Sequence, residues 1–275
     1  MKTLALATAI LTTVVLSQAQ ALPLPFKVDV FAGGVEQDPS GVVSYEAQGS
    51  QDYLDLKNDA HFSQKTQPIV GVKITNNIPF VPDLKVDYMP MKFDGYGTLN
   101  RQITFGGKTY NAGANFNLNA KMNRFDILAY YHVPFITPAT KNIVKLKAGL
   151  NLRVIDFNES FTGNNATING QPVSGYYTES KSLTVPVPMA HLGFSISPIK
   201  QASLVGNVNY ISYGSNNYYD YNIGARFSPK GLFPHLIATP FVQVGYRYEK
   251  LKIDQSSVYA DVKVDGPYAM VGLEF

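Results

Sequence analysis

Hydrophobic and polar side chains alternate along much of the chain with a period of two residues. Every second side chain from Val144 to Val154 is apolar, and the side chains between them are polar or glycine. A period of two places these two sets on opposite faces of one β-strand. Segments 124–133 and 218–228 repeat the pattern clearly. The alternation therefore predicts an all-β protein.

Weaker copies of the pattern bring the expected number of strands to about ten, with eight or twelve as alternatives. They run over 26–36, 66–77, 84–93, 182–197, 202–213, 239–253 and 267–275. Runs of about 9–11 residues match a tilted membrane crossing and exceed the usual length in soluble sheets. We therefore predict an antiparallel, up-and-down transmembrane β-barrel with its apolar face outward. The alternative is a soluble periplasmic sandwich with that face inward.

Tyrosines near several predicted strand ends support the membrane interpretation. Aromatic side chains gather where a barrel meets the two membrane–water interfaces. The tyrosines in question are Tyr88, Tyr131, Tyr210, Tyr219 and Tyr248.

The connections between the predicted strands alternate in length. Short connections marked by proline lie at 78–83, 134–141, 197–200 and 229–240. Longer polar connections lie at 37–65, 94–121, 160–180 and 254–266, with hairpin-turn signals at Gly106-Gly107 and Asn169-Gly170. The short link at 214–217 departs from this rule. Short turns on one rim and long loops on the other are typical of outer-membrane barrels, with the long loops extracellular.

The first residues have the features of a secretory signal peptide. Lys2 precedes an apolar run from Leu4 to Leu16, and Ala19-Gln20-Ala21 fits a cleavage site. A membrane-spanning helix needs about 20 apolar residues, and this run is shorter. We therefore predict an exported protein that is cleaved after Ala21, with a single barrel domain over 22–275.

The end of the chain resembles the C-terminal signal that the barrel-assembly machinery reads in bacterial outer-membrane proteins. Residues 268–275 alternate and end on phenylalanine, with Tyr268, Val271, Leu273 and Phe275 as the signal residues. Three internal stretches resemble an uncharacterised family of Gram-negative outer-membrane β-barrel proteins: IPFVPDLKV (78–86), MAHLGFS (189–195) and VNYISYG (208–214). The resemblance implies the cell outer membrane as location. It also implies outer-membrane lipid and lipopolysaccharide as neighbours and the assembly machinery as a partner. Its motifs are structural and supply no catalytic residues to carry over, so they leave the function open.

In such a barrel, the polar strand faces line the lumen. Charges facing lipid would cost about 2–4 kcal/mol each at the membrane midplane, so we place them inside. A ten-stranded barrel lies close to the size that side chains just fill, which favours a packed layer of ion pairs. The alternative is a narrow polar passage for small anions or zwitterions. The predicted lumen charges are Lys27, Asp29, Lys73, Lys85, Asp87, Arg124, Asp126, Lys145, Lys147, Arg153, Asp220, Arg226, Arg247, Glu249 and Glu274.

Composition narrows the candidate chemistry. A formal net charge of +3 without a dense lysine and arginine cluster argues against nucleic acid as a partner. The absence of cysteine excludes disulfides, thiolate metal sites and a cysteine nucleophile. No glycine-rich phosphate loop stands between a strand and a helix. We therefore expect no cofactor and no metal.

Four residues of the first long loop, Asp52, Asp55, Asp59 and His61, could supply acid–base groups or a cation site at the outer rim. Their spacing fits no calcium or zinc template, so a solvated acidic loop is the simpler interpretation. Of the other histidines, we expect His191 to form hydrogen bonds in the lumen near Ser195 and Ser197, and His132 and His235 to lie at the short-turn rim.

The sequence thus favours a non-enzymatic outer-membrane barrel of the structural or surface-interaction type, with a narrow lumen that could pass small solutes. The alternative is an outer-membrane hydrolase of lipid A or peptide, with a rim site in the first extracellular loop.

Overall fold

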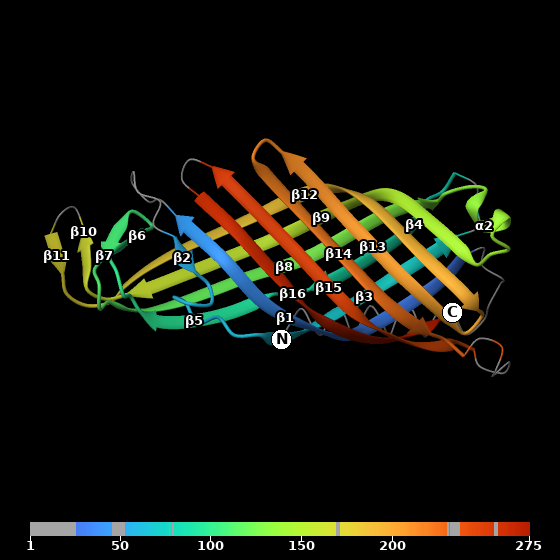
Figure 1. Ribbon diagram of the computed structural model, residues 1–275, viewed down its shortest axis with the longest axis horizontal. Helices are drawn as coiled ribbons and strands as arrows, with labels where there is room; N and C mark the ends of the chain where they lie inside the picture. Colours follow the sequence, from blue (N-terminus) through green and yellow to red (C-terminus); the bar gives the residue numbers. More distant parts are fainter. Residues whose placement is uncertain are drawn as a thin grey trace.

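Ten antiparallel strands close into a barrel (Figure 1), which confirms the predicted fold class and strand number. The computed structural model describes residues 26–275 apart from 46–52, 77, 79, 169–170, 230, 232–236 and 256–257. The predicted signal peptide, 1–21, lies outside the described residues. Most wall positions hold one strand each: β1 (Phe26–Tyr45), β3 (Lys65–Asn76), β8 (Asn115–His132), β9 (Val144–Gly163), β12 (Tyr177–Ile199), β13 (Ala202–Tyr213), β14 (Asn216–Phe227), β15 (Thr239–Gln255) and β16 (Val258–Glu274).

The first and last strands close the barrel. β16 pairs with β15 on one side and with β1 on the other, in a register that runs from Asp29 opposite Glu274 to Tyr45 opposite Val258. Closure satisfies the backbone groups that an open sheet edge would expose to lipid.

One wall position is shared by two strands, β4 (Asp83–Met89) and β5 (Lys92–Thr98), which both pair with β8. The break lies at Pro90, which has no N–H to donate to the ladder. The Met122 N–H bonds to the carbonyl of Met91 directly after the break, so the wall resumes at once.

The two ends of the barrel differ. The connections that follow β3, β8, β12 and β14, the helix α2 (Ile136–Ala139) and the C-terminus lie at one end (Figure 1), which we call the periplasmic end after the usual orientation of outer-membrane barrels. The links from β13 to β14 and from β15 to β16 are also short and lie toward the other end. At the other end lie β2 (Leu54–Asp55) and a small separate sheet of β6 (Ile103–Phe105), β7 (Lys108–Tyr110), β10 (Ala166–Ile168) and β11 (Gln171–Val173). Within the described part of the chain, no helix is long and apolar enough to cross a membrane.

The half of the barrel near the periplasmic end carries an apolar belt on its outside. Leu146, Leu150 and Leu152 are 36%, 69% and 40% exposed, whereas Asn151 and Arg153 between and beside them are buried. This is the arrangement expected of strands that face lipid outside and a filled lumen inside. Tyr219 and Tyr221 both stack on Tyr248 on the outer surface, as aromatic side chains do at a membrane interface.

Beyond the belt, the strands continue as an extension whose faces have the opposite polarity. On β8 the outward side chains become polar, as at Asn117 and Asn119, and the inward Phe116 and Leu118 are buried. Here the outside meets water, so apolar side chains turn inward.

The predicted long loops are therefore wrong in extent. β1 runs to Tyr45, β8 begins at Asn115, and β9 and β12 reach Gly163 and Tyr177. The predicted loop at 254–266 is mostly strand, because β15 ends at 255 and β16 begins at 258. The prediction ends each strand where its apolar outward face ends, and that position marks the membrane surface rather than the end of the strand.

The extension has its own aromatic core. The Phe161 ring, which is 0% exposed, stacks on Phe105 and Phe116 and meets Tyr110 edge-on. Gly106 and Gly107 have φ angles of +59° and +72° and form the predicted hairpin turn between β6 and β7. The other predicted turn, Asn169-Gly170, lies outside the described residues.

Candidate functional site

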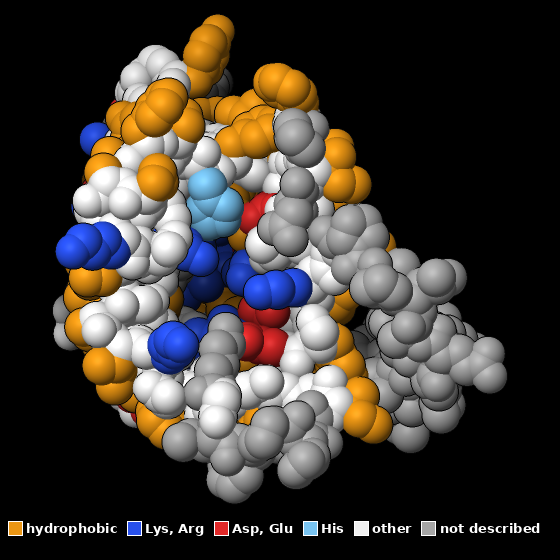
Figure 2. Space-filling view, turned by 90° about the vertical axis from the view of Figure 1, so that its right-hand side faces the viewer, with side chains coloured by type: hydrophobic (Ala, Val, Ile, Leu, Met, Phe, Trp, Pro, Cys, Tyr) orange, Lys and Arg blue, Asp and Glu red, His pale blue; other side chains and the backbone are white. Residues whose placement is uncertain are grey.

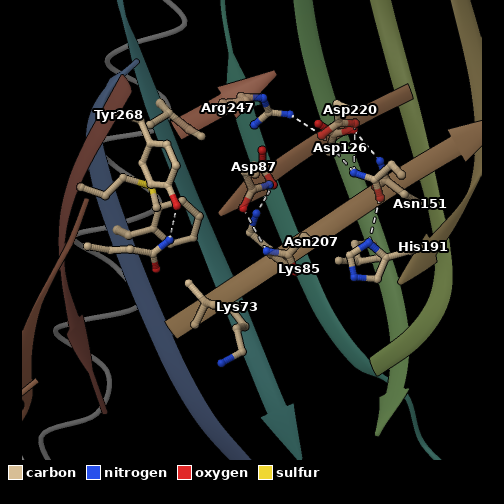
Figure 3. Close-up of a pocket in the computed structure, with 18 of the residues that line it drawn as sticks. Lys73, Lys85, Asp87, Asp126, Asn151, His191, Asn207, Asp220, Arg247 and Tyr268 are labelled. Carbon is tan, nitrogen blue, oxygen red and sulfur yellow. Dashed lines mark hydrogen bonds and ion pairs between the residues drawn. The ribbon is translucent and has the colours of Figure 1, made fainter. Parts of the chain in front are cut away.

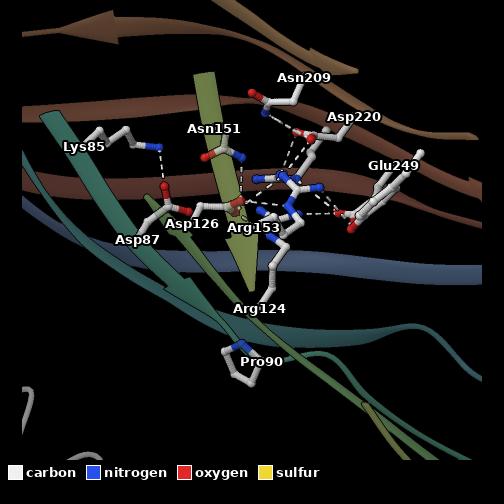
Figure 4. Close-up of polar contacts among 12 residues, drawn as sticks. Lys85, Asp87, Pro90, Arg124, Asp126, Asn151, Arg153, Asn209, Asp220 and Glu249 are labelled. Carbon is white, nitrogen blue, oxygen red and sulfur yellow. Dashed lines mark hydrogen bonds and ion pairs between the residues drawn. The ribbon is translucent and has the colours of Figure 1, made fainter. Parts of the chain in front are cut away.

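A layer of buried ion pairs crosses the lumen (Figure 4). Arg153 of β9 contacts Asp126 of β8 through Nε at 2.7 Å and Asp220 of β14 through Nη2 at 2.7 Å. β14 is separated from β9 by two strands, β12 and β13, so this chain of contacts joins separate parts of the wall.

Three further side chains complete the ion-pair layer. Arg124 contacts Asp126 through Nε at 2.7 Å and Glu249 through Nη1 at 2.5 Å. Arg247 Nη2 lies 2.8 Å from the second oxygen of Asp220. The layer, which we define as Arg124, Asp126, Arg153, Asp220, Arg247 and Glu249, thus pairs three guanidinium groups with three carboxylates.

Neutral donors bind the remaining carboxylate oxygens of the layer. Asn151 donates to Asp126 at 2.7 Å, Asn209 donates to Asp220 at 3.1 Å, and the Tyr218 hydroxyl donates to Glu249. Buried charges are tolerated only when they are paired and hydrogen-bonded to this degree. The layer therefore fills the lumen with a fixed, charge-balanced network.

Below the layer lies a polar cavity of about 140 Å³ near the periplasmic end (Figure 3). Figure 2 looks into this end and shows a hollow with basic side chains around it. Most of these cations are paired: Lys73 and Arg226 each lie 3.2 Å from Asp29, and Lys85 lies 2.7 Å from Asp87.

His191 is buried in the wall of this lower cavity, where its Nδ1 lies 2.8 Å from Asn209 Oδ1. Asn209 in turn donates to Asp220, so the histidine is an extension of the ion-pair layer. Of the two rim histidines, His132 lies 3.2 Å from Asp83, and His235 is outside the described residues.

Above the layer lies a larger cavity of about 440 Å³ inside the extension, which we call the outer chamber. Apolar side chains from opposite sides of the barrel line it, among them Phe93, Phe157, Val187, Leu251 and Val262. Glu249 of the ion-pair layer and its hydrogen-bond donor Tyr218 lie at its floor.

The outer chamber borders a gap in the wall. β12 pairs with β13 only from Ala190 onward, and β13 ends at Tyr213, whereas β12 continues to Tyr177. Two lining side chains next to this gap are strongly exposed, Leu183 at 52% and Tyr213 at 83%. The free stretch of β12 contains Pro186 and Pro188, residues that sheets accept at an unpaired edge. The chamber can therefore be reached from the side, close to the membrane surface.

Most of the predicted lumen charges line these cavities. The six members of the ion-pair layer are among them, and Asp29, Lys73, Lys85, Asp87, Lys147 and Arg226 line the lower cavity. Glu274 pairs with Arg226. Lys27 and Lys145 are exposed.

The acidic residues of the first loop shape a turn. Asp55 Oδ1 accepts hydrogen bonds from the backbone N–H groups of Lys57 and Asn58, and Asp59 Oδ2 accepts one from the N–H of Asp55. His61 has a left-handed φ of 51°, and Asp52 is outside the described residues. Among the described residues, no three metal-ligating side chains converge.

The outer chamber is the feature that the sequence analysis missed. The sequence contains a signal for it, because apolar and polar side chains still alternate in this part of β8, but the apolar ones now lie on the inward face. Examples are Phe116, Leu118, Ala120 and Met122. The sequence analysis places this segment in the long polar connection 94–121.

Solved structures with a similar chain trace are outer-membrane barrels. The outer membrane protease OmpT from Escherichia coli aligns with a TM-score of 0.43 and 12% identity over 93% of this chain and 99% of that one. The translocator domain of the autotransporter NalP from Neisseria meningitidis gives a TM-score of 0.40 and 12% identity over 98% and 96%. OprG from Pseudomonas aeruginosa gives 0.30 and 11% over 90% and 95%. Likeness at this level carries no argument about function.

No protein-family model and no curated protein sequence matches the chain. The resemblance to an uncharacterised barrel family and the C-terminal assembly signal therefore stay predictions.

Proposed function

We propose that this protein resides in the outer membrane and binds a small hydrophobic molecule in the outer chamber. The observation that carries the proposal is a cavity of about 440 Å³ with apolar walls, inside a segment whose outer surface is polar. Ligand sites are typically concave, mostly apolar cavities of this kind with a few polar groups. An empty apolar cavity also costs stability, so a fold that keeps one gains from its occupant.

Binding can be measured with the barrel in lipid nanodiscs and the neutral fluorescent probe N-phenyl-1-naphthylamine. We expect saturable fluorescence enhancement that Ala120→Trp abolishes, because Ala120 lines the chamber. The matched control is Asn119→Trp, which adds the same side chain to the opposite face of β8. Equal binding by the two variants, or no saturable binding by the wild type, would refute the proposal.

The ion-pair layer supports a closed membrane segment. Arg153 and Asp220 side chains at its centre are both 0% exposed, and the layer bridges separate parts of the wall. We infer that small solutes do not diffuse through the resting protein. In planar lipid bilayers the folded protein should give no conductance steps above background, and regular steps would contradict this inference.

We propose a binding role and no catalytic one. The carboxylates of Asp55 and Asp59 accept backbone hydrogen bonds within one turn, which gives them a structural task. Overproduction should leave the lipid A mass spectrum unchanged and cleave no peptide substrate. A change in either assay that Asp55→Asn removes would support the hydrolase instead.

The outer membrane as location rests on the apolar belt and on the predicted signal peptide. The folded protein should need detergent for extraction and should migrate differently on a gel before and after heating. Recovery as a detergent-free soluble protein would refute the assignment.

A further inference from the structure

The lower cavity carries one cation more than its ion pairs account for. Below the ion-pair layer its cationic lining residues are Lys73, Lys85, Lys147 and Arg226. The carboxylates of Asp29, Asp87 and Glu274 pair with three of these side chains. Lys147 is the fourth, and it forms no ion pair with a described residue. Its ammonium group lies 5.3 Å from the centre of the Tyr130 ring.

The residues around Lys147 leave this charge without a carboxylate. Its neighbours across the two ladders of β9 are His132 and Gly193, and both are described. The charges that act on it most strongly are those of three cations, Lys73, Lys85 and Arg226, and of one acid, Asp83. Asp83 is already engaged, because it lies 3.2 Å from His132 and accepts the backbone N–H of Asn76.

The undescribed residues do not supply the missing acid either. Their only carboxylate side chains are those of Glu46 and Asp52. In the sequence both stand between Tyr45 of β1 and Leu54 of β2, two residues at the outer end of the barrel. The lower cavity, at the periplasmic end, therefore keeps a positive charge that an anion can neutralise.

A buried nitrogen of His191 faces the same cavity. Asn209 uses its amide nitrogen to donate to Asp220, so its oxygen accepts from His191 Nδ1. On the neutral ring, Nε2 is then an acceptor, and it has no hydrogen-bond partner among the described residues. The His191 residue is 2% exposed. Because buried polar atoms are rarely left without a partner, this nitrogen points to a ligand that can donate a proton.

Gly193 leaves room between Lys147 and His191. It lies directly opposite Lys147 across the β9–β12 ladder. A Cβ atom at Gly193 would lie 3.2 Å from His191 Nε2 and 2.9 Å from Asn207 Oδ1. Asn207 donates to Asn222 through its amide nitrogen, so its Oδ1 is a second acceptor. The space beside Gly193 thus offers one cation and two hydrogen-bond acceptors.

We propose that the lower cavity binds a small oxyanion that carries its own hydroxyl proton, as the hydrogen phosphate group does. Lys147 contacts an anionic oxygen, and the hydroxyl of the ion donates to His191 Nε2. Sulfate has the same shape and no such proton, so it would leave the acceptors facing lone pairs. Figure 2 shows that the hollow opens at the periplasmic end, where the ion would enter. This site is separate from the outer chamber, and neither proposal depends on the other.

The test measures binding of radiolabelled inorganic phosphate to the folded barrel by equilibrium dialysis at pH 7. Phosphate-free dodecyl maltoside micelles replace the lipid, so that no headgroup phosphate is present. We expect saturable binding, and sulfate should need a concentration at least about tenfold higher than unlabelled phosphate to compete, as one unmatched buried acceptor predicts. Glycerol 3-phosphate is the second competitor. Stronger competition by it than by phosphate supports a phosphate monoester as the source of the group, and weaker competition supports the free ion.

Lys147→Gln should weaken phosphate binding at least about tenfold, because it removes a charge-assisted contact. The matched control is Lys145→Gln, which removes an exposed lysine from the same face of the same strand and should keep the affinity. His191→Phe should remove the preference for phosphate over sulfate. Gel migration before and after heating verifies that each variant is folded.

Three results would overturn the inference. They are the absence of saturable phosphate binding, equal competition by sulfate and phosphate, and an affinity that Lys147→Gln leaves unchanged. The outer chamber is tested independently, because binding of N-phenyl-1-naphthylamine should be the same in Lys147→Gln as in the wild type.

Discussion

The same strands form the membrane belt and the extension, but the apolar side chains point outward in the belt and inward in the extension. On β9, Leu150 and Leu152 point outward to lipid, whereas Phe157 and Phe161 a few residues later point inward. The reversal falls between Val154, which is outward and apolar, and Asp156, which is outward and polar. The period of two continues unbroken through it, so the medium outside the wall decides which face is apolar.

The ion-pair layer occupies the level of this reversal. Asn123 of β8 lies opposite Asp156 of β9 in the register. Asn123 directly precedes Arg124 of the layer, and Asp156 follows Arg153 by three residues. Below this level the lumen has to hold the polar faces, and above it the lumen holds the apolar ones. The layer therefore separates a polar compartment from an apolar one, and variants on either side of it should respond differently.

The largest effect should come from breaking the layer. Arg153→Met leaves the carboxylates of Asp126 and Asp220 buried without their shared partner, which typically costs about 3–5 kcal/mol of unfolding free energy. The measurement is urea unfolding of the barrel in lipid vesicles. As a control, Lys57→Met breaks the exposed pair with Asp38 and should cost less than about 1 kcal/mol. Similar losses in the two variants would show that the layer is not a stabilising network.

A smaller effect on stability should come from adding a lysine to the outer surface of the belt or of the extension. Leu150→Lys puts a cation into lipid near the middle of the belt and should cost about 2–4 kcal/mol. Asn117→Lys puts it into water on the extension and should change stability by less than about 0.5 kcal/mol. Equal costs would mean that the extension is also surrounded by lipid, and would contradict the position of the reversal.

The sequence predicted the barrel because alternation is a local property. Ten segments, their faces and the hairpin turn at Gly106-Gly107 could be read from neighbours in the chain. The extent of the strands could not, because Asn117 and Asn119 are loop-like in composition and become strand residues only when the apolar residues between them have a core to enter.

The sequence could predict which charged residues face the lumen, but it could not predict which of them contact one another. Arg153 and Asp220 could be assigned to the lumen from their faces alone. That they meet depends on the tilt and closure of the barrel, which bring together residues 67 positions apart. The outer chamber depends in addition on where β13 ends relative to β12, and no local pattern encodes that difference.

The smallest predicted effect concerns Glu159 of β9, a carboxylate that lines the apolar outer chamber. Burial raises the pKa of Glu159 from its ordinary 4.5 to about 7, so in that interval the folded protein keeps a proton that the unfolded chain has released. Its contribution to unfolding free energy is therefore full below about pH 4.5 and is lost as the pH rises through about 7. Glu159→Gln cannot ionise, so it should gain stability relative to the wild type between pH 5 and pH 8 in urea unfolding, and an unchanged difference would contradict the burial of the acid. The carboxylates of the ion-pair layer are paired with arginines, so a stability change between pH 5 and pH 8 that Glu159→Gln removes would distinguish the extension from the layer.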